Sequence, residues 1–140
     1  MDIKTRFIIV DDDEFNNRIC TVTIEKMSQD VDIKTFIDPL EGFVHIATEY
    51  AKPGNIDTAI LFLDINMPVM NGWEFLERFE ELDETVKNRI KVHILSSSVD
   101  KADMERARVN KNVAHYLVKP LTKETIRLVT HSHNRDTKPL

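Results

Sequence analysis

The chain has 140 residues, of which 41% are hydrophobic and 31% are charged, so it is long enough for one domain with a substantial core and too apolar for a disordered segment. Its net charge of −5 argues against a nucleic-acid-binding module, and its single cysteine, Cys20, excludes an internal disulfide. No apolar run approaches the ~20 residues that cross a membrane or has the flanks of a signal peptide. We therefore expect a cytoplasmic protein with no nucleic-acid or membrane partner.

The first third of the chain predicts a strand, a helix and a second strand. Residues 7–10 form an apolar run typical of a strand buried on both faces of a parallel sheet. Residues 14–28 follow at helical spacing, and their apolar side chains are predicted to face the core: Phe15, Ile19, Cys20, Val22, Ile24 and Met27. Residues 31–37 alternate apolar and polar side chains, which indicates a less buried strand at the edge of the sheet.

The middle of the chain predicts two helices on either side of the most apolar strand, residues 56–63. Asp38 and Pro39 mark the start of the first helix, which ends before Pro53. Its inward side chains are predicted to be Leu40, Phe43, Val44, Ala47 and Ala51. Asn71 and Glu74 have the spacing of an N-cap, and apolar residues continue at helical spacing from there to Val86.

The last third repeats the pattern twice. Residues 90–95 predict a fourth strand, and a helix with a thin apolar stripe follows over about 99–111, capped by Ser98. Residues 113–118 predict a fifth strand, and Thr122 is placed to cap a last helix, with Leu121 and Ile126 in contact across the cap. Five alternations of strand and helix predict an α/β fold, in which a doubly wound parallel sheet forms one domain over residues 1–140.

Polar residues follow four of the predicted strands. They are Asp11 and Asp12 after the first strand, Asp64 after the third, Ser96 after the fourth and Lys119 after the fifth. Ligands of open α/β sheets bind beyond the carboxyl ends of the strands, so we expect these side chains to converge. Clustered carboxylates repel one another and need a compensating cation. Because the ligands are all oxygen atoms, the cation that fits this site best is Mg²⁺, with Lys119 completing the neutralisation.

A carboxylate beside Mg²⁺, an ammonium and a hydroxyl suits phosphoryl transfer. The cations neutralise charge on the phosphoryl oxygens, and the carboxylate attacks phosphorus in line. Asp64 stands alone on its loop and is the best candidate for the nucleophile, since aspartates form aspartyl-phosphates. Asp11 and Asp12 are then left to bind the metal, and Ser96 to hydrogen-bond the transferred group. Taken alone, the acids after the first strand could equally be a helix N-terminus.

At these residues the chain resembles the response-regulator receiver domain of two-component signalling. The matching motifs are Ile8-Ile9-Val10-Asp11-Asp12, Leu63-Asp64 with Met67-Pro68 and Asn71-Gly72, Leu95-Ser96, and Lys119-Pro120. They occur in the order typical of the family and extend over about residues 5–134, followed by a short C-terminal tail. The resemblance implies a flavodoxin-like (βα)₅ fold with strand order 2-1-3-4-5, in a stand-alone response regulator.

The resemblance also implies roles for the site. Asp64 is the phosphoacceptor, and the donor is the phosphohistidine of a sensor histidine kinase or a histidine phosphotransfer protein. Asp11 and Asp12 bind Mg²⁺ together with Asp64 and the backbone carbonyl of Asn66. The protein is then not an enzyme acting on a separate substrate but a phosphoacceptor that assists its own phosphorylation and dephosphorylation.

Three further residues take roles in the switch by the same resemblance. Ser96 and Lys119 contact the phosphoryl oxygens, and the Lys119–Pro120 peptide bond is cis. Tyr116 matches the switch aromatic, although a simple strand residue explains it equally well. The output face comprises the fourth helix, the fifth strand and the fifth helix, which dock on an unknown protein target. The protein is expected to be a monomer or a phosphorylation-dependent dimer.

Two alternatives remain open at this point. A phosphatase of the haloacid-dehalogenase type also uses an aspartate nucleophile after an apolar strand, but it usually has a second aspartate two residues later, where this chain has Asn66. The other alternative is a degenerate receiver that binds partners without phosphate. The complete set of polar residues at the strand ends argues against it.

Overall fold

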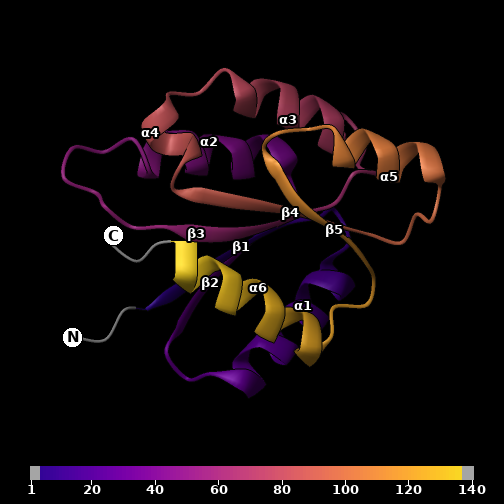
Figure 1. Ribbon diagram of the computed structural model, residues 1–140, viewed down its shortest axis with the longest axis horizontal. Helices are drawn as coiled ribbons and strands as arrows, with labels where there is room; N and C mark the ends of the chain where they lie inside the picture. Colours follow the sequence, from indigo (N-terminus) through magenta and orange to yellow (C-terminus); the bar gives the residue numbers. More distant parts are fainter. Residues whose placement is uncertain (1–3, 137–140) are drawn as a thin grey trace.

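A computed structural model of the chain describes residues 4–136 and contains one parallel sheet of five strands with the order β2-β1-β3-β4-β5 (Figure 1). The strands are β1 (Thr5–Val10), β2 (Val31–Phe36), β3 (Ala59–Leu63), β4 (Ile90–Ser96) and β5 (Val113–Val118). The helices are α1 (Glu14–Met27), α2 (Pro39–Glu49), α3 (Gly72–Glu80), α4 (Glu84–Lys87), α5 (Lys101–Arg108) and α6 (Lys123–Asp136). The predicted flavodoxin-like fold is confirmed. The tail expected after residue 134 extends outside the described residues.

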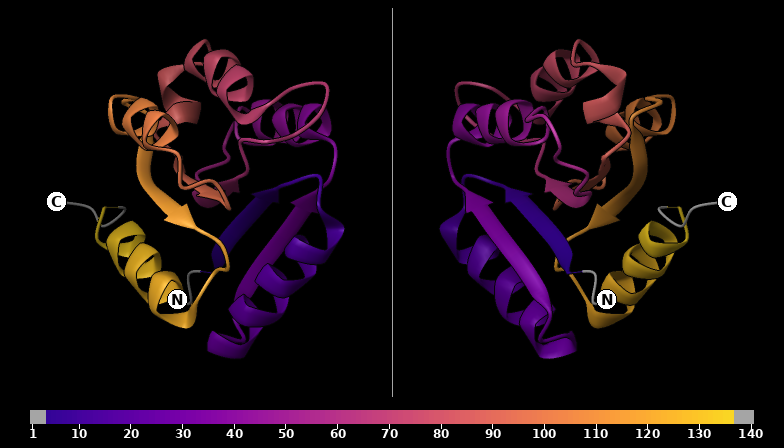
Figure 2. Two further views of the ribbon diagram at one scale, coloured as in Figure 1. Left: turned by 90° about the vertical axis from the view of Figure 1, so that its right-hand side faces the viewer. Right: turned by 90° about the vertical axis from the view of Figure 1, so that its left-hand side faces the viewer.

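Helices cover both faces of the sheet (Figures 1 and 2). α1 and α6 pack on one face, where Phe7, Cys20 and Val129 belong to one apolar cluster. α2, α3, α4 and α5 lie over the other face, where the larger cluster includes Ile46 and Phe75. β3 is buried along its whole length, whereas β2 is an edge strand with partly exposed side chains, as the two sequence patterns predict. Within residues 4–136, no helix has both the length and the apolar character needed to cross a membrane.

Several helix starts follow the predicted caps. The side chain of Asp38 accepts from the backbone N–H of Leu40, and Asn71 and Glu74 form a reciprocal capping box. The hydroxyl of Thr122 accepts from the backbone N–H of Thr125 at the start of α6. Each cap satisfies amide groups that the first helical turn leaves without partners, which fixes where the helix begins.

The structure corrects the predicted inward faces of the first two helices. Phe15 is 71% exposed and Leu40 is 47% exposed, and Val22 and Val44 are exposed as well. Cys20 and Ile24 do face the core, and in α2 the buried side chains are those of Pro39 and Ile46. In both helices, apolar side chains cover more of the helix surface than the part that contacts the sheet. The pattern therefore predicts a helix but not which of its apolar side chains are buried.

The predicted helix over residues 71–86 is wrong in its length. It is two helices, α3 and α4, because the backbone of Asp83 is extended at φ −57° and ψ 146°. Val86 is nevertheless buried, so the apolar spacing predicted burial correctly and missed the break.

Two other boundaries also differ from the prediction. β3 begins at Ala59 and not at Ile56, which is 82% exposed, and α5 is shorter than the predicted 99–111. The N-cap of α5 is Asp100, whose side chain accepts from the N–H of Ala102, and not Ser98.

Candidate functional site at the carboxyl ends of the strands

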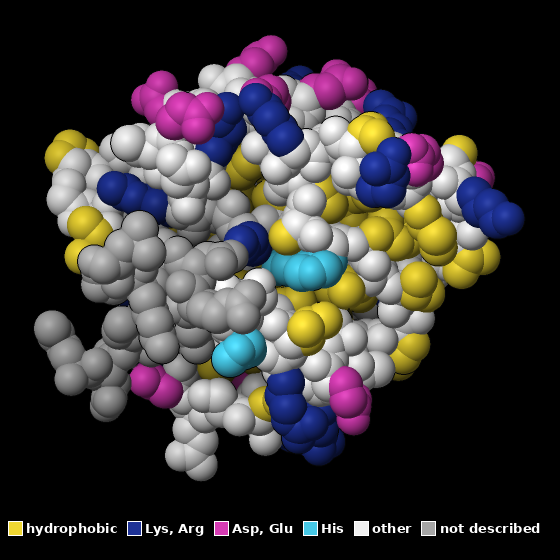
Figure 3. Space-filling model, in the orientation of Figure 1, with side chains coloured by type: hydrophobic (Ala, Val, Ile, Leu, Met, Phe, Trp, Pro, Cys, Tyr) yellow, Lys and Arg dark blue, Asp and Glu magenta, His cyan; other side chains and the backbone are white. Residues whose placement is uncertain are grey.

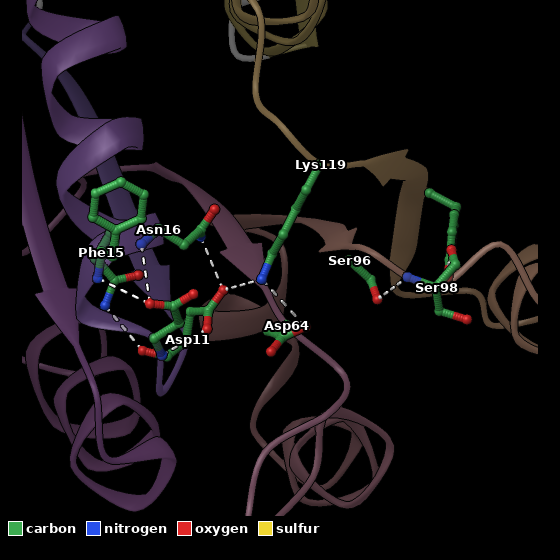
Figure 4. A network of polar contacts seen from close by, with 10 residues as sticks. Asp11, Phe15, Asn16, Asp64, Ser96, Ser98 and Lys119 are labelled. Atoms are coloured by element: carbon green, nitrogen blue, oxygen red, sulfur yellow. Dashed lines mark hydrogen bonds and ion pairs between the residues drawn. The ribbon is translucent and has the colours of Figure 1, made fainter.

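Three acidic side chains meet where β1 and β3 end. Ligand oxygens of Asp11, Asp12 and Asp64 all lie within 4.8 Å of one another. Asp11 and Asp64 are buried, and Asp12 is exposed at the rim. Lys119 reaches this group from the end of β5: its Nζ lies 2.7 Å from Oδ2 of Asp11 and 3.9 Å from Oδ1 of Asp64 (Figure 4). The structure therefore brings together four of the residues that the sequence placed at one rim.

Backbone hydrogen bonds fix the two strand ends relative to each other. The N–H of Asp64 donates to the carbonyl of Val10 at 3.0 Å, which aligns the end of β3 with the end of β1. Gly72 packs directly beneath: its N–H donates to the carbonyl of Ile65, and a Cβ at this position would lie 2.6 Å from the carbonyl oxygen of Asp64. The Asn71-Gly72 motif thus begins α3 and also allows α3 to approach the backbone of Asp64 closely.

Asp11 is held by several donors. Its Oδ1 accepts from the backbone N–H of Asp13 at 2.9 Å, and its Oδ2 accepts from Nδ2 of Asn16 at 2.9 Å as well as from Lys119. The amide of Asn17 donates to the backbone carbonyl of Asp11 at 2.9 Å. Asn16 and Asn17 are buried and hydrogen-bond to Asp11, and the sequence motifs did not single them out. Their position in the first turn of the helix that follows the acids could have indicated that their amides reach Asp11.

Asp13 has a structural role in the same region. It is the N-cap of α1, and its side chain accepts from the backbone N–H groups of Phe15 and Asn16. The cap fixes the first turn of α1 beside the acids, so Asp13 positions the segment that carries Asn16.

The charges of the site shift the protonation of two groups. Burial raises the pKa of Asp64 to about 6, and the neighbouring charge of Asp11 adds to this, while Lys119 and the N–H groups of Asn66 and Ile65 oppose it. Burial disfavours the ammonium of Lys119, but its bond to Asp11 and the nearby carboxylates leave its pKa raised. One ammonium therefore only partly compensates the acids, and a divalent cation would complete the neutralisation.

Ser96 and Tyr116 are connected through the loop after β4. Ser96 is fully buried, and its Oγ accepts from the backbone N–H of Ser98 at 3.0 Å (Figure 4). The hydroxyl of Tyr116 donates to the carbonyl of Ser98 at 2.8 Å. The N–H of Lys119 donates to the carbonyl of Ser96, and the predicted cis peptide between Lys119 and Pro120 is confirmed. The loop that starts at Ser96 is thus tied to the half-buried Tyr116.

Asn66 lies two residues after Asp64 in the loop between β3 and α3. Its side chain is exposed. Its backbone N–H is directed at the carboxylate of Asp64, whereas the metal-binding role expected of its carbonyl stays a prediction. The atoms that could coordinate a metal ion are all carboxylate or carbonyl oxygens, and Mg²⁺ prefers oxygen ligands of this kind.

Comparison with known proteins assigns the family. Residues 7–131 match the family model described as the response regulator receiver domain. The chain belongs to this family. The receiver's fold is similar to that of a response regulator receiver protein from Dyadobacter fermentans, with a TM-score of 0.81 and 30% identity over 96% of this chain and 99% of that one. A two-component response regulator from Cytophaga hutchinsonii is also similar, with a TM-score of 0.82 and 29% identity over 95% and 99% of the two chains.

Curated relatives differ in how much of their length this receiver spans. It is 26% identical to the chemotaxis protein CheY1 of Helicobacter pylori over 87% of this chain and 90% of that protein. It is 29% identical to the cyclic di-GMP phosphodiesterase response regulator RpfG of Xanthomonas campestris over 90% of this chain, but spans only 31% of that protein. The shared part is therefore the receiver domain.

Proposed function

We propose that this receiver is a signalling switch that accepts a phosphoryl group on Asp64 in a Mg²⁺-dependent reaction. The observation that carries the proposal is the placement of the Lys119 ammonium between Asp11 and Asp64, with Asp12 at the rim of the same cluster. The donor is a phosphohistidine of a sensor histidine kinase or of a histidine phosphotransfer protein. The protein works in the cytoplasm, with no nucleic-acid or membrane partner.

The transfer is an in-line displacement at phosphorus. A carboxylate oxygen of Asp64 forms the new P–O bond, the P–N bond to the donor histidine breaks, and the electron pair returns to the imidazole ring. Lys119 pairs with a phosphoryl oxygen, and the hydroxyl of Ser96 donates to another. Burial and the charge of Asp11 raise the pKa of Asp64, whereas the nearby Lys119 ammonium lowers it and so favours the ionised form, which is the nucleophile.

Asp11, Asp12 and the backbone carbonyl of Asn66 would hold Mg²⁺ together with Asp64. When bound, Mg²⁺ neutralises charge on the transferred group. No substrate other than the phosphodonor is turned over, so the protein acts as a phosphoacceptor that assists its own phosphorylation and dephosphorylation, and not as an enzyme.

The output is a change on the face formed by α5, β5 and α6, which are the fourth helix, the fifth strand and the fifth helix predicted from the sequence. Apolar side chains gather over this part of the surface (Figure 3). Val99 and Val109, which flank α5, and Val118, which ends β5, are exposed. A phosphoryl group on Asp64 that accepts a hydrogen bond from Ser96 would pull on the loop after β4. The carbonyl of Ser98 in this loop accepts from the hydroxyl of Tyr116, so the movement would couple the site to this face. The downstream protein target docks here, with the receiver as a monomer or as a phosphorylation-dependent dimer.

Acetyl phosphate tests the proposal without a known partner. Incubation with Mg²⁺ is expected to add one phosphoryl group to the wild-type protein by intact mass spectrometry, and none in EDTA or in Asp64→Asn. A mass gain that survives Asp64→Asn would refute the proposal. Steady hydrolysis of a small phosphate ester with no change in protein mass would favour the phosphatase alternative.

A further inference from the structure

We propose that Asn16 is a positioning residue that holds the carboxylate of Asp11 in the orientation needed for binding Mg²⁺. The inference rests on the proposed function of the Asp64 site. It assigns a role to a residue that contacts neither the phosphoacceptor nor the transferred group.

The contacts of Asp11 show why one amide can control its orientation. Nδ2 of Asn16 donates to Oδ2 of Asp11 at 2.9 Å, and the same oxygen accepts from Lys119 at 2.7 Å (Figure 4). The other carboxylate oxygen accepts from the backbone N–H of Asp13. Three donors from three different positions of the chain therefore fix the plane of the carboxylate. Asn16 is the only one of the three that is a neutral side chain.

The location of Asn16 makes its hydrogen bond hard to replace. The residue is 7% exposed and lies in the first turn of α1, where its own backbone N–H donates to Asp13. The thiol of Cys20, one turn later, also contacts its side chain. The backbone of Asn16 is therefore fixed by the N-cap residue Asp13, and its side chain is fixed by contact with the buried Cys20. If its amide were removed and its volume kept, Oδ2 of Asp11 would lose one of the two donors that hold it and keep only Lys119.

The neutral charge of the amide matters as much as its position. A second ammonium at this place would neutralise Asp11 and weaken its attraction for a divalent cation. A carboxylate would add repulsion to a cluster that is already acidic. An asparagine orients Asp11 and leaves its charge available to the metal. Residues that orient metal ligands in this way typically change metal affinity by about 10–100-fold when they are mutated.

Asn16→Leu tests this role because it removes the donor and keeps the branched arrangement of four side-chain heavy atoms, although the methyl groups are somewhat bulkier. Thr23→Ala is the matched control: it also removes a polar group from α1, but the hydroxyl of Thr23 bonds only the carbonyl of Ile19. Mg²⁺ affinity is measured by titration calorimetry on the full chain, and thermal unfolding is measured in EDTA. If Asn16→Leu does not fold, Asn16→Ala takes its place in the same measurements.

The expected result is a loss of Mg²⁺ affinity of about tenfold or more in the Asn16 variant, and no loss in Thr23→Ala. At saturating Mg²⁺, acetyl phosphate should label the Asn16 variant at a rate close to that of the wild type, because the substitution affects metal binding and not the transfer itself. A folded Asn16 variant with wild-type Mg²⁺ affinity would overturn the inference. Failure of the wild-type protein itself to bind Mg²⁺ or to be labelled would instead overturn the proposed function.

Discussion

This receiver buries titratable side chains in two places, and burial shifts their pKa values in opposite directions. At the strand ends, burial raises the pKa of Asp64 to about 6. Inside the sheet, burial lowers the pKa of His93 on β4 to about 3, helped by His115, Lys91 and His133. In both places the protein interior disfavours the charged form.

The surroundings of the two groups explain the different outcomes. His93 is 1% exposed and stacks on His115 of β5, with ring centroids 5.1 Å apart and Nδ1 atoms 3.2 Å apart. Burial within this stack favours the neutral form of the His93 ring. Asp64 instead lies beside Lys119 and the exposed Asp12, where a further cation can reach it. The basic group near Asp64 favours its charged form, which suits a reactive site, whereas the basic groups near His93 oppose its charged form, which suits packing.

Gly72→Ala should break the strand-end cluster while leaving the histidine pair intact. The new Cβ would lie 2.6 Å from the carbonyl oxygen of Asp64, and backbone cannot move aside as a flexible side chain can. We expect the free energy of unfolding to fall by about 2–3 kcal/mol, with weaker Mg²⁺ binding. Urea unfolding measures the loss, and Glu81→Ala at the exposed C-cap of the same helix should change stability by less than about 0.5 kcal/mol. A fully stable Gly72→Ala would show that α3 is free to shift.

Acid should destabilise the protein through His93. Below its ordinary pKa of 6.5 the unfolded chain binds a proton at this residue, whereas the folded chain does not until about 3, so the stability is lost as the pH falls between these values. From pH 7 to pH 5 this contribution is about 2 kcal/mol. His93→Phe should remove it, while the exposed His131→Gln should not. Equal acid sensitivity of His93→Phe and the wild type in urea unfolding would exclude His93 as the cause.

Asp64 should contribute with the opposite sign over the same interval. Its folded pKa lies above its ordinary value of 3.8, so the folded protein binds a proton first and gains stability as the pH falls through about 6. We expect this gain to be at most about 1 kcal/mol between pH 7 and pH 5. Asp64→Asn, measured by urea unfolding in EDTA, should therefore lose more stability on acidification than the wild type. A smaller loss would contradict the raised pKa.

Val69→Asn should give the smallest effect, and it should stabilise the protein. Val69 is 98% exposed in the loop after β3 and has a φ of 70°, in the left-handed region that β-branched residues rarely adopt. Asparagine tolerates this conformation, so the free energy of unfolding should rise by about 0.5–1 kcal/mol, as measured by urea unfolding. A decrease would mean that the valine side chain makes a contact that its exposure does not suggest.

The sequence predicted the sheet and the convergence of the strand-end residues because both depend on chain order. Five alternating elements with right-handed connections place all strand ends on one edge, and this brings Asp11, Asp64 and Lys119 together. The packing of α1 was less predictable, since the exposure of Phe15 depends on which part of a wide apolar stripe reaches the sheet.

The missed residues were those whose role depends on side-chain geometry. Asn16 resembles an ordinary residue of a first helical turn, and only coordinates show its amide on Asp11. The pairing of His93 with His115 is hidden in the same way, because His93 lies on β4 and His115 lies on β5, the next strand in space. Pairings of this kind are set by register between strands, which periodicity alone does not supply.

Chemical trapping of the acyl phosphate tests the central assignment most directly. Borohydride reduces an aspartyl phosphate to homoserine, so the protein is treated with acetyl phosphate and Mg²⁺, reduced, digested and sequenced by mass spectrometry. The account predicts homoserine at position 64 alone, and none when Mg²⁺ is withheld. Homoserine at position 11 or 12, or a phosphorylated protein that yields no homoserine, would contradict it.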